Sequence, residues 1–231
     1  DFVGVGLVIG FSQYVYHGSR LLLLIAAFAF LYLLWLRKAT LLQIIVACLV
    51  VLVVFAPLGT FFLGHWQEFV GRSEDVFIFS QRNLQNAMGP DATFANDLLP
   101  YLRHQFVTTL EFITGGGDRS SFYVAELPIF DPITLVLLWL GFGAVLVRIR
   151  RFEESVVTAW FLLGMLFAGF LTTEQPNGPR IVSVAPAIYL IGGIFVQRVW
   201  DLLPAPASKG SRRLASAVVG VLALVLLFLN W

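Results

Sequence analysis

Residues 14–24 read YVYHGSRLLLL, and they place a histidine and an arginine between two strongly apolar runs. A second stretch, TTEQPNGPRI at residues 172–181, repeats this arrangement, because Arg180 opens another apolar run. An ionisable side chain at the edge of a membrane-embedded segment is costly, so it is a candidate functional residue by default. We therefore expect Arg20 and Arg180 to lie on the same membrane face, beside the one long polar region of the chain.

The composition predicts an integral membrane protein. Apolar residues make up 58% of the 231 residues, charged residues only 13%, and the mean hydropathy is +0.85. Soluble domains have about 45–50% apolar and about 25% charged residues. The net charge of +1 indicates no nucleic-acid partner. Cys48 is the single cysteine, so neither a disulfide within the chain nor a cysteine metal site is expected.

Apolar runs of about 17–25 residues are long enough to cross the hydrocarbon core. By this measure the chain is an all-α, polytopic bundle of about seven transmembrane helices. The three expected regions are residues 1–64 (the first three helices), 65–131 (an extracytoplasmic loop region) and 132–231 (the last four helices). The expected spans are residues 2–16, 21–36, 41–63, 133–147, 155–171, 181–199 and 214–231. The chain begins at Asp1 without an initiator methionine and ends on an apolar run, so we expect a portion of a longer protein.

Lysine and arginine in the short loops set the orientation. They gather at residues 37–38, 148–151 and 198–213, three segments that alternate along the chain and would all be cytoplasmic. Arg20 and Arg180 then lie outside, together with the histidines and the long polar region. We expect a multi-pass protein of a bacterial or archaeal plasma membrane.

The polar region of residues 65–131 is too rich in Phe, Leu and Val for a disordered connector. Apolar residues recur every fourth position, which predicts an amphipathic helix from about residue 91 to 113 that ends before three glycines. Such a helix could lie on the outer membrane surface or pack on the rest of the external region. The row consists of Phe94, Leu98, Leu102, Phe106 and Leu110.

Arg20 follows Tyr16 by four residues and His17 by three, so all three could share one helical face. The functional interpretation is a clamp for a phosphate or pyrophosphate, since arginine carries a planar, permanently charged fork. The alternative is an arginine whose head group reaches the lipid headgroups. The second external arginine, Arg180, favours the clamp.

Other polar residues carry weaker indications. Glu174 could pair with Arg180 or orient an acceptor, although a solvated turn carboxylate is the favoured interpretation. His65 and Arg72 open the long polar region. They are candidate substrate-binding residues, and metal ligation by His65 with Glu74 and Asp75 is conceivable but not indicated by the spacing. No other cofactor is indicated.

Two further short motifs have structural interpretations. Gly6 and Gly10 fit close helix packing better than a dinucleotide fingerprint, which would need a preceding strand and a following acidic residue. Asp118 and Arg119, after three glycines, predict a turn with a local ion pair.

Four segments, in order, resemble the family 39-like glycosyltransferases of the GT-C superfamily, the relatives of protein O-mannosyltransferases and of the aminoarabinose transferase. In this chain a Gly-rich helix ends in Tyr-x-x-x-Arg, a His–aromatic–Arg segment follows, then a Pro-and-Asp helix entry and a Pro-x-x-x-Arg turn. Many members have proline after the histidine, where this chain has Trp66. The segments are GLVIGFSQYVYHGSRLLLL (6–24), FFLGHWQEFVGRSEDVFIF (61–79), LPIFDPITLVLLWLGFGAVLVRIRR (127–151) and PNGPRIVSVAPAIYLIGGI (176–194).

The resemblance implies a glycosyltransferase that uses a polyprenyl-phosphate-linked sugar and transfers it to a protein, lipid or glycan on the extracytoplasmic side. It also implies a catalytic Asp in a loop upstream of residue 1, so no catalytic residue is assigned in this chain. Two other functions stay open. One is an O-antigen ligase or polymerase that uses a lipid pyrophosphate glycan, and the other is a non-catalytic lipid or solute transporter, which would show charges at mid-membrane depth and repeated halves with broken helices.

Overall fold

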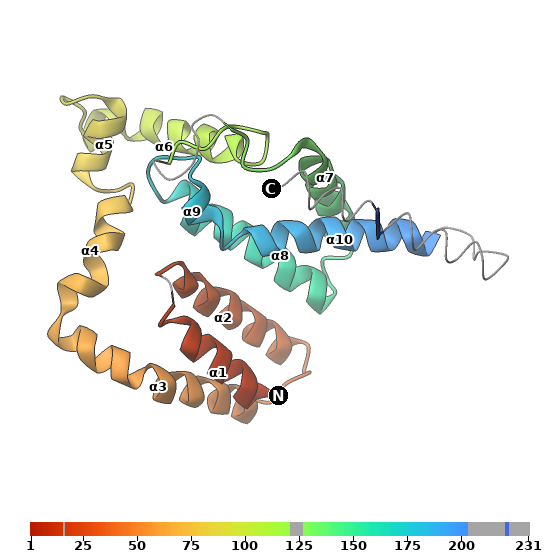
Figure 1. Ribbon diagram of the computed structural model, residues 1–231. Coiled ribbons are helices and arrows are strands. Elements are labelled where there is room, and N and C mark those ends of the chain that lie inside the picture. The colour runs from red at the N-terminus through yellow and green to blue at the C-terminus, as the bar shows by residue number, and fades with distance from the viewer. Residues whose placement is uncertain (16, 121–126, 203–219, 222–231) are drawn as a thin grey trace.

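The computed structural model describes residues 1–15, 17–120, 127–202 and 220–221, with only the backbone of His17 and Arg72. In these residues all regular elements are helices, so the all-α class is confirmed for this part of the chain (Figure 1). The elements are α1 (Phe2–Ser12), η1 (His17–Ser19), α2 (Arg20–Trp35), α3 (Leu41–Gly64), α4 (Trp66–Val76), α5 (Gln81–Met88), α6 (Phe94–Glu111), α7 (Pro132–Val147), α8 (Phe152–Gly164), η2 (Met165–Phe170), α9 (Gly178–Ile181) and α10 (Ala185–Leu202).

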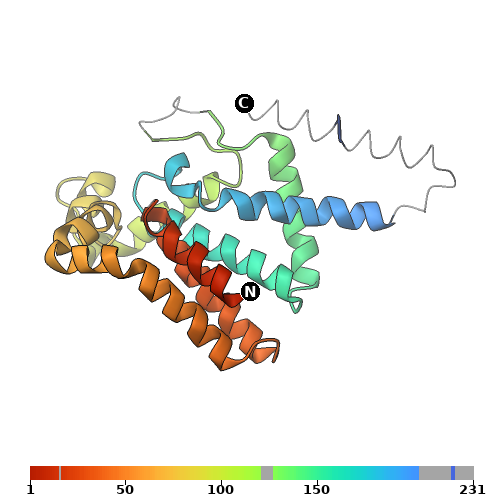
Figure 2. The same cartoon turned by 60° about the horizontal axis from the view of Figure 1, so that its bottom comes forward.

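The helices form two groups joined by a connecting arm. Figures 1 and 2 show α1, α2 and α3 together on one side, and α7, α8 and α10 crossing one another on the other. The arm is α4, which continues from the end of α3 and leads to α5 and α6. The two groups meet along α2 and α8.

Two glycines bring α1 against α3. A Cβ on Gly6 would lie 2.7 Å from the carbonyl oxygen of Ala47, and a Cβ on Gly10 would lie 2.7 Å from the Cβ of Val54. These distances leave no room for a side chain, so the two backbones approach closely. The packing role expected for Gly6 and Gly10 is confirmed.

The second group is built in the same way around α10. A Cβ on Gly141 of α7 would lie 2.3 Å from the carbonyl oxygen of Ile191, so α7 and α10 cross in close contact. Leu138, Val145 and Ile188 are buried beside this crossing. Because all of these residues are apolar, this group has a continuous hydrophobic core.

A hydrogen bond and a ring contact of Tyr32 join the two groups at one end of α2. The hydroxyl of Tyr32 donates a hydrogen bond to the carbonyl oxygen of Arg150 at 2.9 Å, and its ring stacks on Phe152, with 6.2 Å between centroids. At the other end of α2, Arg20 begins the helix beside α4.

The region of residues 65–131 contains more helix than expected. The predicted helix at 91–113 is present as α6, but α4 and α5 were not predicted. The buried face of α6 consists of Tyr101, Gln105, Thr108 and Thr109. The predicted apolar row is largely turned outward, with Phe106 56% exposed.

Helix boundaries differ from the predicted spans at three places. α1 ends at Ser12 rather than at residue 16, and a 3₁₀ turn precedes Arg20. The predicted span 155–171 is an α-helix that passes into the π-helix η2. The predicted span 181–199 is divided between α9 and α10, because the chain turns after Ile181. The last predicted span, 214–231, lies outside the described residues except for residues 220–221.

Two described helices are long and apolar enough to cross a membrane, judged by length and composition: Leu41–Gly64 and Phe152–Phe170. α3 is apolar yet largely exposed, with Leu42 and Val53 among its uncovered side chains. A long helix with an exposed apolar surface is suited to contact with lipid. α3 therefore gives weak support for a membrane protein.

Candidate functional site

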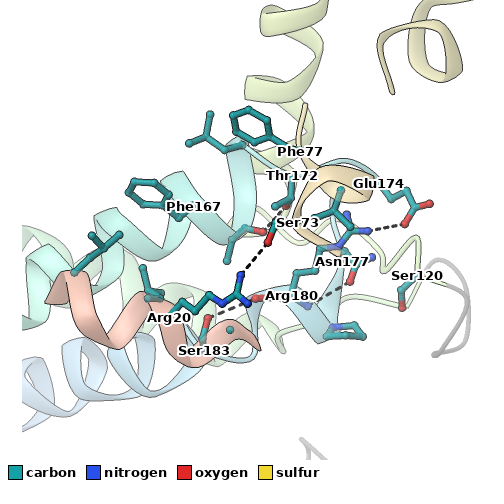
Figure 3. A pocket seen from close by; sticks show the side chains of 17 residues that line it. Arg20, Ser73, Phe77, Ser120, Phe167, Thr172, Glu174, Asn177, Arg180 and Ser183 are labelled. Carbon is teal, nitrogen blue, oxygen red and sulfur yellow. Dashed lines mark hydrogen bonds and ion pairs between the residues drawn. The ribbon is translucent and has the colours of Figure 1, made fainter. Parts of the chain in front are cut away.

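A cavity of about 380 Å³ lies where α2, α4, η2 and the turn before α9 meet (Figure 3). Ligand pockets typically measure about 300–1,000 Å³, so this cavity is large enough for part of a small-molecule ligand. Its lining residues are Gly18, Arg20, Leu21, Leu24, Ser73, Val76, Phe77, Ser120, Phe167, Ala168, Leu171, Thr172, Glu174, Asn177, Pro179, Arg180 and Ser183.

Arg20 enters the cavity from the start of α2. Its guanidinium donates to the Ser73 hydroxyl at 3.2 Å and to the Phe69 carbonyl oxygen at 2.9 Å. It also lies over the Phe69 ring, 4.1 Å from the centroid, in a cation–π contact. Arg20 therefore ties α4 to α2, and these bonds use only part of the five N–H donors that a guanidinium offers.

Arg180 is held by the turn that precedes α9. The side-chain oxygen of Asn177 accepts from the Arg180 backbone N–H at 3.3 Å, and the guanidinium donates to the carbonyl oxygen of Thr173. The guanidinium also forms an ion pair with Glu174 at 3.0 Å. The Arg180 side chain is 19% exposed and that of Glu174 is 67% exposed, so the pair joins a half-covered cation to a solvated anion. Glu174 thus pairs with Arg180 and is also a largely solvated carboxylate, as the favoured interpretation expected.

The chain after α6 fixes this turn. The carboxylate of Asp118 is buried and accepts from the backbone N–H of Gly178 at 3.0 Å. The backbone N–H of Arg119 donates to the Pro176 carbonyl oxygen at 2.9 Å, and its guanidinium donates to the Gln175 carbonyl oxygen. These bonds join two segments that are far apart in the sequence, and they determine where the turn sits.

The expected local ion pair between Asp118 and Arg119 is wrong. Arg119 instead pairs with Glu111, with 2.8 Å between nitrogen and oxygen. The two Asp118 oxygens instead accept backbone N–H groups, from Ser120 and from Gly178.

The remaining wall of the cavity is apolar. Leu21 and Leu24 of α2 face Phe167, Ala168 and Leu171 of the η2 segment across it. η2 is a single π-helical stretch at the end of α8, and such stretches are frequent at functional sites because the wider turn redirects side chains. The cavity thus has cations along one part and hydrocarbon along another.

The structure brings Arg20 and Arg180 to the same cavity. It does not bring His65 there, because His65 ends α3, where its Nδ1 lies 3.0 Å from the Phe61 carbonyl oxygen and its ring stacks on Phe61. His17 lies in the 3₁₀ turn η1, so no α-helix carries both His17 and Arg20, and the shared α-helical face is wrong. Tyr16 and the side chain of Arg72 lie outside the described residues. A role of these residues in ligand binding stays a prediction.

Several cavity residues were not predicted. Ser73, Ser120 and Asn177 reach the cavity through contacts between distant segments, which a reading of local pattern does not reveal. Asn177 carried a usable signal, because Asn followed by Gly-Pro is a typical start of a helix. Within the described part of the chain, no three His, Cys, Asp or Glu side chains are grouped so that they could hold a metal ion.

No protein-family model matches the chain, and no curated protein or solved structure matches it either.

Proposed function

We propose that the chain belongs to a membrane glycosyltransferase. The enzyme takes a sugar from a polyprenyl-phosphate-linked donor and transfers it to a protein, lipid or glycan acceptor on the extracytoplasmic side. The single observation that carries the proposal is the cavity in which Arg20 and Arg180 share a wall with hydrocarbon side chains. A lipid phosphate fits such a cavity, because it has an anionic group for the arginines and a hydrocarbon chain for the apolar side chains.

The two arginines suit a phosphate group. Charge-assisted hydrogen bonds from a guanidinium to phosphate are short and strong, and the planar fork binds two oxygens at once. Arg20 is already aligned by Ser73 and Phe69, and Arg180 by Thr173. Because these contacts fix the arginine side chains before the ligand binds, the side chains lose little conformational entropy on binding.

The apolar wall suits the isoprenoid chain. Leu21, Leu24 and Phe167 offer uncharged surface directly beside the cations. A lipid tail lying there would stay between α2 and η2 while its phosphate reaches the arginines. Burial of hydrocarbon contributes about 25 cal/mol per Å², so the tail would supply much of the affinity.

The proposed topology is multi-pass, with about seven membrane helices and residues 65–131 outside. The apolar α1, α2, α3, α7 and α8 support it by composition. In this orientation Arg20 and Arg180 lie at the outer edge of the bilayer, where a lipid phosphate would be presented.

The test is binding and transfer by the purified protein in lipid nanodiscs, with radiolabelled decaprenyl-phosphate mannose as donor. Arg20→Lys and Arg180→Lys keep the positive charge but lose the bidentate contact of a guanidinium with phosphate. Each substitution should weaken donor binding about tenfold. Arg37→Lys is the matched control, because Arg37 is exposed at the opposite end of α2. Melting temperatures are measured in parallel, since Arg20 also holds α4.

The outcomes separate the possible functions. Donor binding that falls in both cavity variants and not in Arg37→Lys, with transfer by the wild type, supports the glycosyltransferase. Activity only with pyrophosphate-linked glycans would replace the proposal with the ligase. Movement of the lipid between leaflets without transfer of sugar would replace it with a transporter.

A further inference from the structure

Ser120 has a buried hydroxyl without a hydrogen-bond partner. The residue is 6% exposed, it lines the cavity, and its Oγ makes no hydrogen bond within the described structure. A buried polar atom left unpaired costs about 1–3 kcal/mol, so such atoms in native proteins usually have a reason. For a hydroxyl that lines a cavity, the simplest reason is that it forms a hydrogen bond with a bound ligand.

Hydrogen bonds to Asp118 fix the backbone position of Ser120. One oxygen of Asp118 accepts from the Ser120 backbone N–H, and the other accepts from the Gly178 backbone N–H at 3.0 Å. Asp118 therefore holds Ser120 next to the turn that carries Asn177. Figure 3 shows Ser120 on the far side of Arg180 from Arg20, so the hydroxyl lies away from the Arg20 end.

This end of the cavity carries hydroxyl, carboxamide and carboxylate groups, from Ser120, Asn177 and Glu174. These groups accept and donate hydrogen bonds in the way that sugar hydroxyls require. The Glu174 carboxylate pairs with Arg180 at 3.0 Å, so this polar end adjoins the guanidinium assigned to the phosphate.

We propose that the end of the cavity lined by Ser120, Asn177 and Glu174 binds the sugar of the donor, while Arg20 and Arg180 bind its phosphate. This inference rests on the proposed function and adds the arrangement of the ligand within the cavity. It makes Ser120 a residue that distinguishes sugar-bearing lipid from bare lipid phosphate.

The experiment compares two probes on the full chain in nanodiscs: decaprenyl phosphate, and decaprenyl phosphate that carries mannose. Ser120→Ala should weaken binding of the mannose-bearing lipid about five-fold, the effect of one hydrogen bond, and leave the bare lipid unchanged. Because the hydroxyl has no partner in the protein, the substitution should not lower the melting temperature. Ser120→Cys, nearly the same size with a weaker donor, should give an intermediate loss.

The control is Ser12→Ala, which removes a hydroxyl that donates to the Ile9 carbonyl oxygen in α1, away from the cavity. It should change neither affinity. Equal binding of the two probes by the wild type would overturn the sugar site, as would a Ser120→Ala effect that is absent or the same for both. If the wild type binds neither probe, the proposed function itself fails and the sugar site with it. Failure to bind either probe is thus distinguishable from equal binding of the two probes, which would overturn only the sugar site.

Discussion

Arg198 of α10 and Glu154 of α8 form an ion pair inside the second helix group, with 2.8 Å between nitrogen and oxygen. The Arg198 guanidinium also donates to the Ala144 carbonyl oxygen of α7, so one side chain joins three helices. By sequence, Arg198 was assigned only to a cytoplasmic loop. In the structure the Arg198 cation, near the end of α10, is also neutralised by the buried carboxylate of Glu154.

Loss of one partner of this pair should destabilise the protein. Glu154→Gln leaves the Arg198 charge partly buried without its counter-ion, which costs about 3–5 kcal/mol when such a pair is fully buried and less here. Replacement of both residues by leucine should cost less than the single change. Thermal unfolding in detergent measures both, and Glu153→Gln is the control because Glu153 is exposed. Equal losses in the single and double variants would show that the uncompensated charge of Arg198 is not the cause of the loss.

The contact of α1 with α3 should be sensitive to a single methyl group. Gly6→Ala places a Cβ within 2.7 Å of the Ala47 carbonyl oxygen, so the helices must separate. Gly4→Ala meets only ordinary contacts at 3.8 Å and should be neutral, or stabilising by up to about 1 kcal/mol through helix propensity. We expect a lower melting temperature for Gly6→Ala only. Parallel behaviour of the two variants would contradict close packing.

The outward apolar row of α6 should contact lipid. Phe106 and Leu98 are exposed, while the polar Gln105 and Thr108 are buried, so α6 leaves large apolar side chains uncovered. In a Cys48→Ser background, a fluorophore on Phe106→Cys should be quenched by lipid-borne quenchers. The same label on Asp91→Cys, which is exposed before α6, should respond to aqueous quenchers instead. Aqueous quenching at both positions would place the helix away from the membrane.

The ionisation of Tyr101 should limit stability in alkali. Burial raises the pKa of its hydroxyl above the ordinary value near 10, and Gln105, one turn along α6, offsets part of this shift without forming a hydrogen bond to Tyr101 Oη. The unfolded chain therefore releases this proton first. The contribution of Tyr101 is complete below about pH 10 and is lost as the pH rises through the folded pKa.

Tyr101→Phe tests this prediction. The variant should unfold with a shallower pH dependence above about pH 10, and the absorbance titration of phenolate should lose one late-titrating component. Near pH 7 its stability should match the wild type, because the hydroxyl that is removed has no partner. A wild-type curve that stays parallel to that of the variant would mean that Tyr101 titrates normally.

Hydropathy was sufficient for the helical class and for most helix positions. α2, α3 and α7 match the predicted spans within about one residue, because long apolar runs have no competing structure. The four-residue period likewise located α6. Which face of α6 is buried did not follow from it, since the neighbours that cover Tyr101 and Gln105 come from other segments.

The cavity could be predicted only in part. Arg20 and Arg180 were identifiable because each opens an apolar run, and alternating topology puts such positions on one side. Their partners were not, since Ser73 and Phe69 lie about fifty residues from Arg20 and depend on the course of α4. Asp118 was misassigned for the same reason, as its acceptor role needs Gly178, which is equally distant.

The bond between Tyr32 and Arg150 lies at the opposite end of α2 from the cavity. The Tyr32 ring stacks on Phe152 at the same end, whereas Arg20 at the cavity end is bonded to α4. α2 is thus held at its two ends by different neighbours, so a substitution at Tyr32 would loosen the junction with α8 and leave the contacts of Arg20 in place.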